Sequence, residues 1–153
     1  MEKFKKLSWS LYALILICFA MPFVTVSCGG QKVMSVTGIQ LITGTTTQIS
    51  GQTQKLDPSP YVIGAFIFTV IGLFFVIKNN KNNFRNGSIV NALTIIMLFI
   101  YKTNTDNQAV NQGQGAITLD YNFGFWGTVF LSFVVAIIMI YYYQTYPVEK
   151  KDK

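Results

Sequence analysis

Four long apolar runs, separated by polar segments, constrain this chain more than any other feature of its sequence. They cover about residues 7–26, 60–77, 84–101 and 123–146. A helix needs about 20 apolar residues to cross the roughly 30 Å hydrocarbon layer of a bilayer, and each run approaches that length. Hydrophobic residues make up 51% of the chain and charged residues 12%, about half the charged share of a soluble domain. The pattern predicts a membrane all-α bundle of four transmembrane helices in one membrane domain, 1–153.

The ends of the runs carry signals that suit membrane-spanning helices. Pro58 precedes the second run and Pro60 opens it, and proline fits the first turn of a helix. The third run has a short apolar core, and it reaches full length if Arg85 extends its charged end to the interface. The outer loops are then 27–59 and 102–122, and the inner loop is 78–83.

The basic residues divide unequally between the two ends of the predicted bundle. One side collects nine of the twelve: Lys3, Lys5, Lys6, Lys78, Lys81, Arg85, Lys150, Lys151 and Lys153. The other side holds Lys32, Lys55 and Lys102. Cytoplasmic loops are enriched in Lys and Arg, so both termini are predicted to be cytoplasmic, in a bacterial inner membrane. Because the basic residues flank apolar runs, membrane lipid is the expected partner and nucleic acid is not.

The two cysteines lie ten positions apart, at Cys18 and Cys28. On a helix this places them about 15 Å apart along the axis, beyond the reach of a disulfide. We expect Cys28 at the outer membrane boundary, uncleaved and unpaired within its own chain. An alternative is a cleaved, lipidated signal ending before Cys28, because a basic start and an apolar run precede it. An intermolecular disulfide at Cys28 also remains open.

Two segments of the outer loops alternate polar and apolar residues as strands do. They are residues 31–42, which follow the turn signal Gly29-Gly30, and residues 116–121. The segments 43–55 and 103–115 are rich in Gly, Thr, Gln and Asn, and predict turns or mobile loops. We therefore expect a small extracytoplasmic antiparallel β-sheet cap.

In that cap, residues 33–42 are expected to pair with residues 116–121. The side chains expected to face the outer end of the bundle are Val36, Ile39, Leu41, Ile117 and Leu119.

The layout of four spans, with strands in a larger first outer loop and one more in the second, resembles that of claudins in topology only. The tryptophan and cysteine pair of that family's first loop are absent, since Cys28 is alone there. The run Pro22–Cys28, followed by Gly-Gly-Gln and a Ser-Val-Thr-Gly-Ile-Gln-Leu stretch, is similar to small uncharacterised bacterial four-span membrane proteins. This resemblance implies a fold and no activity.

Chemistry-bearing residues are sparse. The chain has no histidine, no CxxC pair, and three acidic residues on the predicted outer side, Asp57, Asp106 and Asp120. Catalysis and metal binding need titrating or ligating groups in a cluster. The sequence therefore predicts no enzyme, no cofactor and no metal site. Proton-coupled transport is disfavoured as well, because no span carries an ionisable residue in its centre.

Small and polar residues mark expected helix contacts. Gly64, Phe68 and Gly72 recur every four residues, so they lie on nearly one helix face and predict close packing against a neighbour. Asn91 and Thr94 are the most polar residues of the third span and are expected to hydrogen-bond across helices.

The functional expectation is a non-enzymatic binding or assembly subunit of a membrane complex, as a homo-oligomer or with another membrane protein. Exposed outer strand edges would suit addition of a partner strand. One alternative is a homo-oligomeric pore in which Asn91, Thr94 and Ser132 line a path between protomers. A further alternative is a toxin- or phage-neutralising membrane protein.

Overall fold

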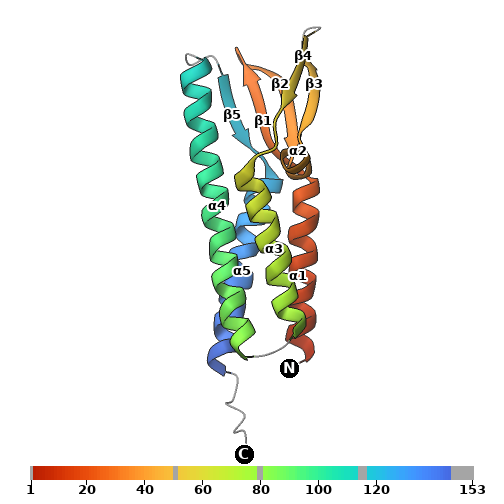
Figure 1. Cartoon of the computed structure of the whole chain (residues 1–153), viewed down its shortest axis with the longest axis vertical. Helices are drawn as coiled ribbons and strands as arrows, with labels where there is room; N and C mark the ends of the chain where they lie inside the picture. Colours follow the sequence, from red (N-terminus) through yellow and green to blue (C-terminus); the bar gives the residue numbers. More distant parts are fainter. Residues whose placement is uncertain (1, 50–51, 79–80, 114–116, 146–153) are drawn as a thin grey trace, which may run out of the picture.

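The computed structural model describes residues 2–49, 52–78, 81–113 and 117–145. In these residues four long helices lie side by side, and strands gather at one end of them (Figure 1). The long helices are α1 (Glu2–Ala20), α3 (Pro60–Lys78), α4 (Lys81–Gly113) and α5 (Phe123–Thr145).

Three of these helices are long and apolar enough to cross a membrane. They are α3, the Asn82–Asn111 part of α4, and α5, whereas the apolar part of α1, Lys6–Ala20, is shorter. The chain is thus a mostly helical, multi-pass membrane protein by the length and composition of its helices, with a small antiparallel sheet.

The first span is shorter than the sequence predicts. The expected run of 7–26 ends as a helix at Ala20, and Pro22–Cys28 forms strand β1. Proline lacks the N–H that a helix interior needs and disfavours helix in the residue before it. Residues 24–26 are all β-branched, and such side chains favour strands. The apolar character of 21–26 therefore belongs to the cap.

The third predicted span also differs in the structure, because α4 runs through Gly113 instead of ending near Tyr101. The loop predicted for 103–115 is therefore wrong up to Gly113. No glycine or proline interrupts residues 102–112. The Thr103 and Thr105 hydroxyls donate to carbonyls one turn back, at Phe99 and Tyr101, so these polar groups are satisfied within the helix.

Strand β1 is the centre of a three-stranded antiparallel sheet of order β2-β1-β5. Its neighbours are β2 (Gln31–Thr37) and β5 (Ile117–Tyr121). The turn between β1 and β2 uses Gly29 and Gly30 at φ 58° and 81°, the left-handed conformation that tight hairpins require.

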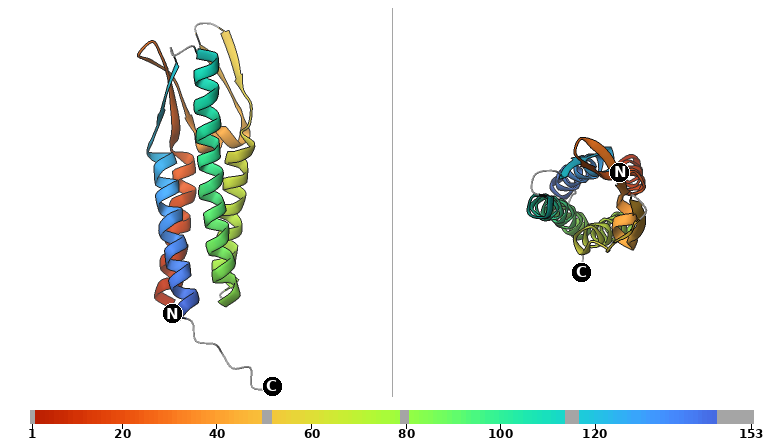
Figure 2. Two further views of the ribbon diagram at one scale, coloured as in Figure 1. Left: turned by 90° about the vertical axis from the view of Figure 1, so that its left-hand side faces the viewer. Right: turned by 90° about the horizontal axis from the view of Figure 1, so that it is seen from above.

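The predicted pairing of residues 33–42 with residues 116–121 is wrong, since β5 pairs with β1. The helices explain this: β1 follows α1, β5 precedes α5, and α1 and α5 pack together. The two strands therefore leave neighbouring helices side by side (Figure 2). Asn122 links the start of β1 to the end of β5. Its N–H donates to the Phe23 carbonyl (2.9 Å), and its side-chain amide donates to Thr25 Oγ1 (2.7 Å).

The predicted strand of residues 31–42 ends earlier than expected, at Thr37. Residues Gly38–Thr43 form the short helix α2, which Thr37 and Gln40 cap reciprocally at its start. A Cβ on Gly38 would lie 2.8 Å from the Phe19 carbonyl oxygen, so glycine lets α2 sit directly on the end of α1.

A second hairpin follows α2, made of β3 (Thr45–Ile49) and β4 (Gln52–Leu56). The turns predicted for 43–55 are therefore replaced by paired strands over most of that range. Threonine is a good strand former despite its polarity, and three consecutive threonines open β3.

Inside the bundle, each long helix contributes one buried stripe at helical spacing. The stripes include Tyr12, Ile15 and Phe19 of α1, Val62, Ala65, Thr69 and Val76 of α3, Asn91, Thr94 and Leu98 of α4, and Phe125, Thr128, Ser132, Val135 and Met139 of α5. Lipid-facing side chains such as Ile67, Phe74 and Phe130 remain exposed.

The cap continues this core outward. Val36 and Leu41 are buried, and Leu119 packs against the core, whereas Ile117 is half-buried. Ile39 is 47% exposed, because α2 replaces the expected strand and points that position away from the bundle.

Candidate functional site

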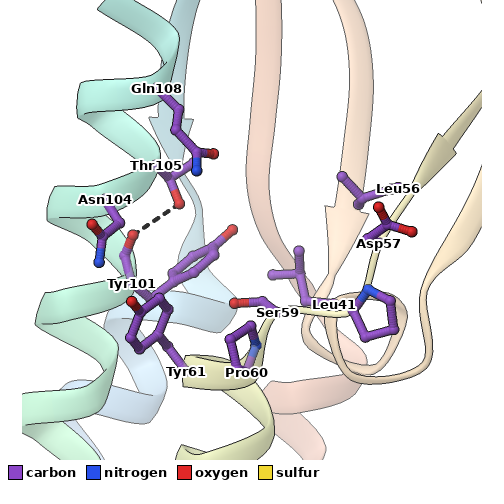
Figure 3. A pocket seen from close by; sticks show the side chains of 11 residues that line it. Leu41, Leu56, Asp57, Ser59, Pro60, Tyr61, Tyr101, Asn104, Thr105 and Gln108 are labelled. Atoms are coloured by element: carbon purple, nitrogen blue, oxygen red, sulfur yellow. Dashed lines mark hydrogen bonds between the residues drawn. The ribbon is translucent and has the colours of Figure 1, made fainter.

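One hollow at the outer end of the protein lies between α4 and the segment that joins β4 to α3. Its volume is about 380 Å³, within the range of small-molecule sites, roughly 300–1,000 Å³. Figure 3 shows its side chains converging from α4 on one side and from residues 56–61 and Leu41 on the other. We name it the outer pocket.

One wall of the outer pocket is the part of α4 that the sequence predicted to be a loop. Tyr101, Asn104, Thr105 and Gln108 line it, and their spacing of three, one and three residues places them on one helix face. Tyr101 is 5% exposed, and its carbonyl accepts a hydrogen bond from Thr105 Oγ1 at 2.8 Å. This helical spacing within 101–108 was the signal that could have identified the wall from the sequence.

The opposite wall is held in place by backbone contacts. The Ser59 N–H donates to the Leu41 carbonyl at 2.8 Å, and the Ile63 N–H donates to the Ser59 carbonyl at 3.0 Å. Gly44 has a φ of 76°, and a Cβ there would lie 3.1 Å from the Leu56 carbonyl oxygen. Glycine at the end of α2 therefore allows the 56–58 segment to pass close by.

Among the described residues that line the outer pocket, Asp57 carries the one charge. Its carboxylate lies 4.0 Å from Lys55 Nζ, and both side chains are largely exposed, so this ion pair contributes little to stability. The other polar groups are amides and hydroxyls, of Asn104, Gln108 and Thr105 among others.

The basic residue of α4 at this level points elsewhere. Lys102 Nζ lies 2.6 Å from Asp106 Oδ2 and 4.7 Å from the centre of the Tyr121 ring. The Tyr121 hydroxyl in turn donates to Asp106 Oδ1 at 2.9 Å. Burial first, and then this hydrogen bond, raise the pKa of Tyr121 above its usual range.

A second, open hollow of about 350 Å³ lies on α4 below the outer pocket. Ile96, Phe99 and Ile100 form its apolar part, and Thr103 and Asn104 form its outer end. Asn104 lines both hollows. We name the second one the apolar hollow.

The sheet has two unequal edges. The β5 edge is covered by α4: the Tyr121 hydroxyl donates to Asp106 Oδ1 at 2.9 Å and lies 3.2 Å from the Lys102 carbonyl oxygen. Within the described part of the chain, β2 pairs with β1 and with no further strand. Its outer edge is thus available for pairing.

Among the predicted polar contacts, Asn91 crosses between helices and Thr94 does not. Asn91 Nδ2 donates to the Tyr12 hydroxyl oxygen at 2.6 Å and lies 3.7 Å from Met139 Sδ. Thr94 Oγ1 donates to the Val90 carbonyl of its own helix at 3.1 Å. Both residues are buried inside the bundle, as is Ser132.

The three predicted packing residues of α3 do not share one neighbour. A Cβ on Gly72 would collide with the Tyr12 hydroxyl, whereas one on Gly64 would meet Met97 Sδ at an ordinary 3.8 Å. Gly72 is buried, and Gly64 and Phe68 are half-buried. The close contact predicted for this face therefore exists at Gly72, between α3 and α1.

Cys28 lies at the far end of β1, exposed, and Cys18 is buried in α1. A seven-residue strand extends about 20 Å, so Cys28 lies at the tip of the cap, about that far beyond the end of α1. Its position at the outer membrane boundary stays a prediction. Its register neighbours are Gln31 and Ile117.

In the part of the chain that the structure describes, no group of three or more His, Cys, Asp or Glu side chains is placed to hold a metal ion. No protein-family model matches the chain, and no curated protein matches its sequence significantly.

Proposed function

We propose that this protein is a non-enzymatic binding and assembly subunit of the bacterial cytoplasmic membrane, which docks an extended strand of another membrane protein or a second copy. The partner strand adds to the outer edge of β2 and extends the three-stranded sheet. Strand addition of this kind draws affinity from backbone hydrogen bonds and specificity from the side chains on either face.

The open edge of β2 is the observation that supports this proposal. Proteins usually protect such edges with lysine, proline, bulges or a covering element. Here α4 covers the β5 edge. Near its tip β2 carries Lys32 and a register irregularity at Val33, but Met34–Thr37 is paired with β1 and has neither charge nor proline. Val33 is 36% exposed, which leaves an apolar contact beside the free backbone.

The proposed topology has four spans with both termini cytoplasmic. The apolar part of α1 is 15 residues long (Lys6–Ala20), yet α1 packs beside α3 and α5 along the bundle. The start of α1 and the end of α5 lie at the end opposite the strands (Figure 1). Both outer segments contribute strands to the cap. This supports the proposed resemblance to claudins, which concerns topology only.

Site-specific photo-crosslinking in native membranes tests the proposal. A photoreactive residue at Val33, on the free edge, should give one discrete adduct of defined mass. The same residue at Thr118, exposed on the covered strand β5, is the matched control and should give none. Equal adducts from both positions would show that contact at Val33 reflects random collision.

Two proline variants sharpen this test. Adjacent residues of a strand point their N–H groups to opposite sides, so Met34→Pro and Ser35→Pro remove one inward and one outward donor. The variant that loses the outward donor should keep its thermal stability and lose the Val33 adduct. If the adduct persists in that stable variant, partner binding does not use backbone pairing at β2.

A further inference from the structure

The first long helix is too short to cross a bilayer on its own. Its apolar part, Lys6–Ala20, has 15 residues, or about 22 Å of helix, against a hydrocarbon layer of roughly 30 Å. In its last turn, the ring of Phe19 packs edge to face against the ring of Phe66 in α3, with 5.3 Å between ring centres. Phe66 lies six residues after Pro60, where α3 begins, so α1 ends up to about 9 Å short of the start of α3.

The short helix α2 fills this gap. At its start, Gly38 lies against the Phe19 carbonyl, where a Cβ would come within 2.8 Å of the oxygen. Near its end, the Leu41 carbonyl accepts from the N–H of Ser59, the residue before α3, at 2.8 Å. α2 therefore joins the end of α1 to the start of α3, at the base of the strands (Figure 1). A helix with its side chains is about 10 Å across, so α1 and α2 together match the thickness of the hydrocarbon layer.

Polar groups at both ends of α2 are hydrogen-bonded within the chain, which lowers the cost of contact with lipid. The Thr37 N–H donates to Gln40 Oε1 at 2.9 Å, and the Gln40 N–H donates to Thr37 Oγ1 at 3.2 Å. At the other end, the Thr43 hydroxyl donates to the Ile39 carbonyl at 3.1 Å. No residue of Gly38–Thr43 is charged, so α2 presents no group that must remain in water.

The exposed face of α2 carries an apolar side chain at the level of the membrane. Ile39 is 47% exposed, and Thr43, one turn further along, is exposed with its hydroxyl bonded to the Ile39 carbonyl. The outer end of α1 exposes Ile17 and Met21. Apolar side chains are therefore exposed on both elements where α2 rests on α1.

We propose that α2 is an interfacial helix that completes the first span, with the Ile39 side chain inserted among the acyl chains of the outer leaflet. An interfacial helix of this kind buries its apolar side chains at the boundary between headgroups and acyl chains. The inference rests on the proposed topology, in which α1 crosses the membrane, and is independent of strand docking. Because β2 ends at Thr37, where α2 begins, the free edge of β2 then lies in water, as unpaired backbone groups require.

Spin-label accessibility tests the proposal with the full-length protein in vesicles of phosphatidylethanolamine and phosphatidylglycerol. Cys28→Ser removes the exposed thiol and leaves Cys18, which is buried, so one label can be attached at a chosen position. At Ile39→Cys, collisions with oxygen, which dissolves among acyl chains, should exceed collisions with a water-soluble nickel chelate. The ratio should be several times that at Thr46→Cys, the aqueous control, since Thr46 is exposed on β3.

A lipid control separates this inference from the topology on which it rests. Ile17→Cys places the label on an exposed position of α1, and its ratio should be as high as that at Ile39→Cys. A high ratio at Ile17 with an aqueous ratio at Ile39 would overturn the role of α2 and leave the first span in place. Aqueous ratios at both positions would overturn the crossing by α1 and this inference with it.

Discussion

Asn91 of α4 donates a hydrogen bond from Nδ2 to the hydroxyl oxygen of Tyr12 in α1, at 2.6 Å, in the interior of the bundle. The same Nδ2 donates to the Gly87 carbonyl at 2.9 Å. Both side chains are buried, at 2% and 0% exposed. In lipid, where no hydrophobic force draws helices together, such a bond helps to define which helices meet.

Asn91→Ala is expected to lower the free energy of unfolding in detergent by about 0.6 to 2 kcal/mol, the range for polar contacts between membrane helices. Tyr12→Phe should cost a similar amount, because it removes the other partner of the bond. The double variant should cost less than the two single costs combined. Additive losses in a thermal or denaturant titration would mean that the two groups do not act together.

Gly72 and Gly64 should respond differently to the same added methyl group. Gly72→Ala places a Cβ against the Tyr12 hydroxyl, and overpacking of this kind costs about 1 to 3 kcal/mol. Gly64→Ala meets Met97 at normal contact distance and should be neutral or slightly stabilising. Thermal unfolding of both variants in one detergent checks this, and equal tolerance would refute the α1–α3 contact.

Tyr121 should make stability depend on pH in the alkaline range. Its pKa is raised in the folded protein, so the neutral phenol is favoured there. That stabilisation is complete below the unfolded pKa, about 10, and is lost as the pH rises through the folded pKa. The difference in melting temperature between the wild type and Tyr121→Phe should therefore be constant from about pH 7 to about 9 and shrink above about 10.

A matched variant separates this effect from general alkaline unfolding. Phe130→Leu changes an exposed ring of α5 that has no titratable group, so its difference from the wild type should stay constant across the same pH series. A parallel decline in both variants would assign the pH effect to other groups.

Ile117→Cys should form a disulfide with the native Cys28. The two residues are direct partners in the register of β1 and β5, and opposed residues in an antiparallel pair lie about 4.5 to 5.5 Å apart between Cα atoms, within disulfide geometry. Peptide mapping under mild oxidation detects the bond. Val36→Cys with Leu119→Cys is the contrast: β1 lies between those strands, so this pair should not cross-link.

Reporter fusions at Gly51 and Lys153 should report opposite sides of the membrane. In the sequence, Gly51 lies between β3 and β4, and Lys153 lies after α5. The bias of basic residues predicts the cytoplasm for Lys153. Reporters active on the same side would mean that the chain crosses the membrane an even number of times between them, contrary to one crossing by each of α3, α4 and α5.

The amino-acid sequence by itself determined the class of this protein. Apolar runs of fixed length predicted α3 and α5 to within a few residues, because the thickness of a bilayer sets the length of a spanning helix. Alternation in 117–121 predicted β5, and Gly29-Gly30 predicted the hairpin turn, since both are local signals.

The tertiary structure decided what local signals leave ambiguous. Val24 and Val26 are as apolar in a strand as in a membrane helix, so the end of α1 depended on pairing with β2 and β5. The polar stretch 102–113 is helical because contacts with β5 through Asp106 support it, not because its composition demands it. The outer pocket also depends on the tertiary structure. Its two walls are distant in sequence, and they meet only because α4 extends beyond α3.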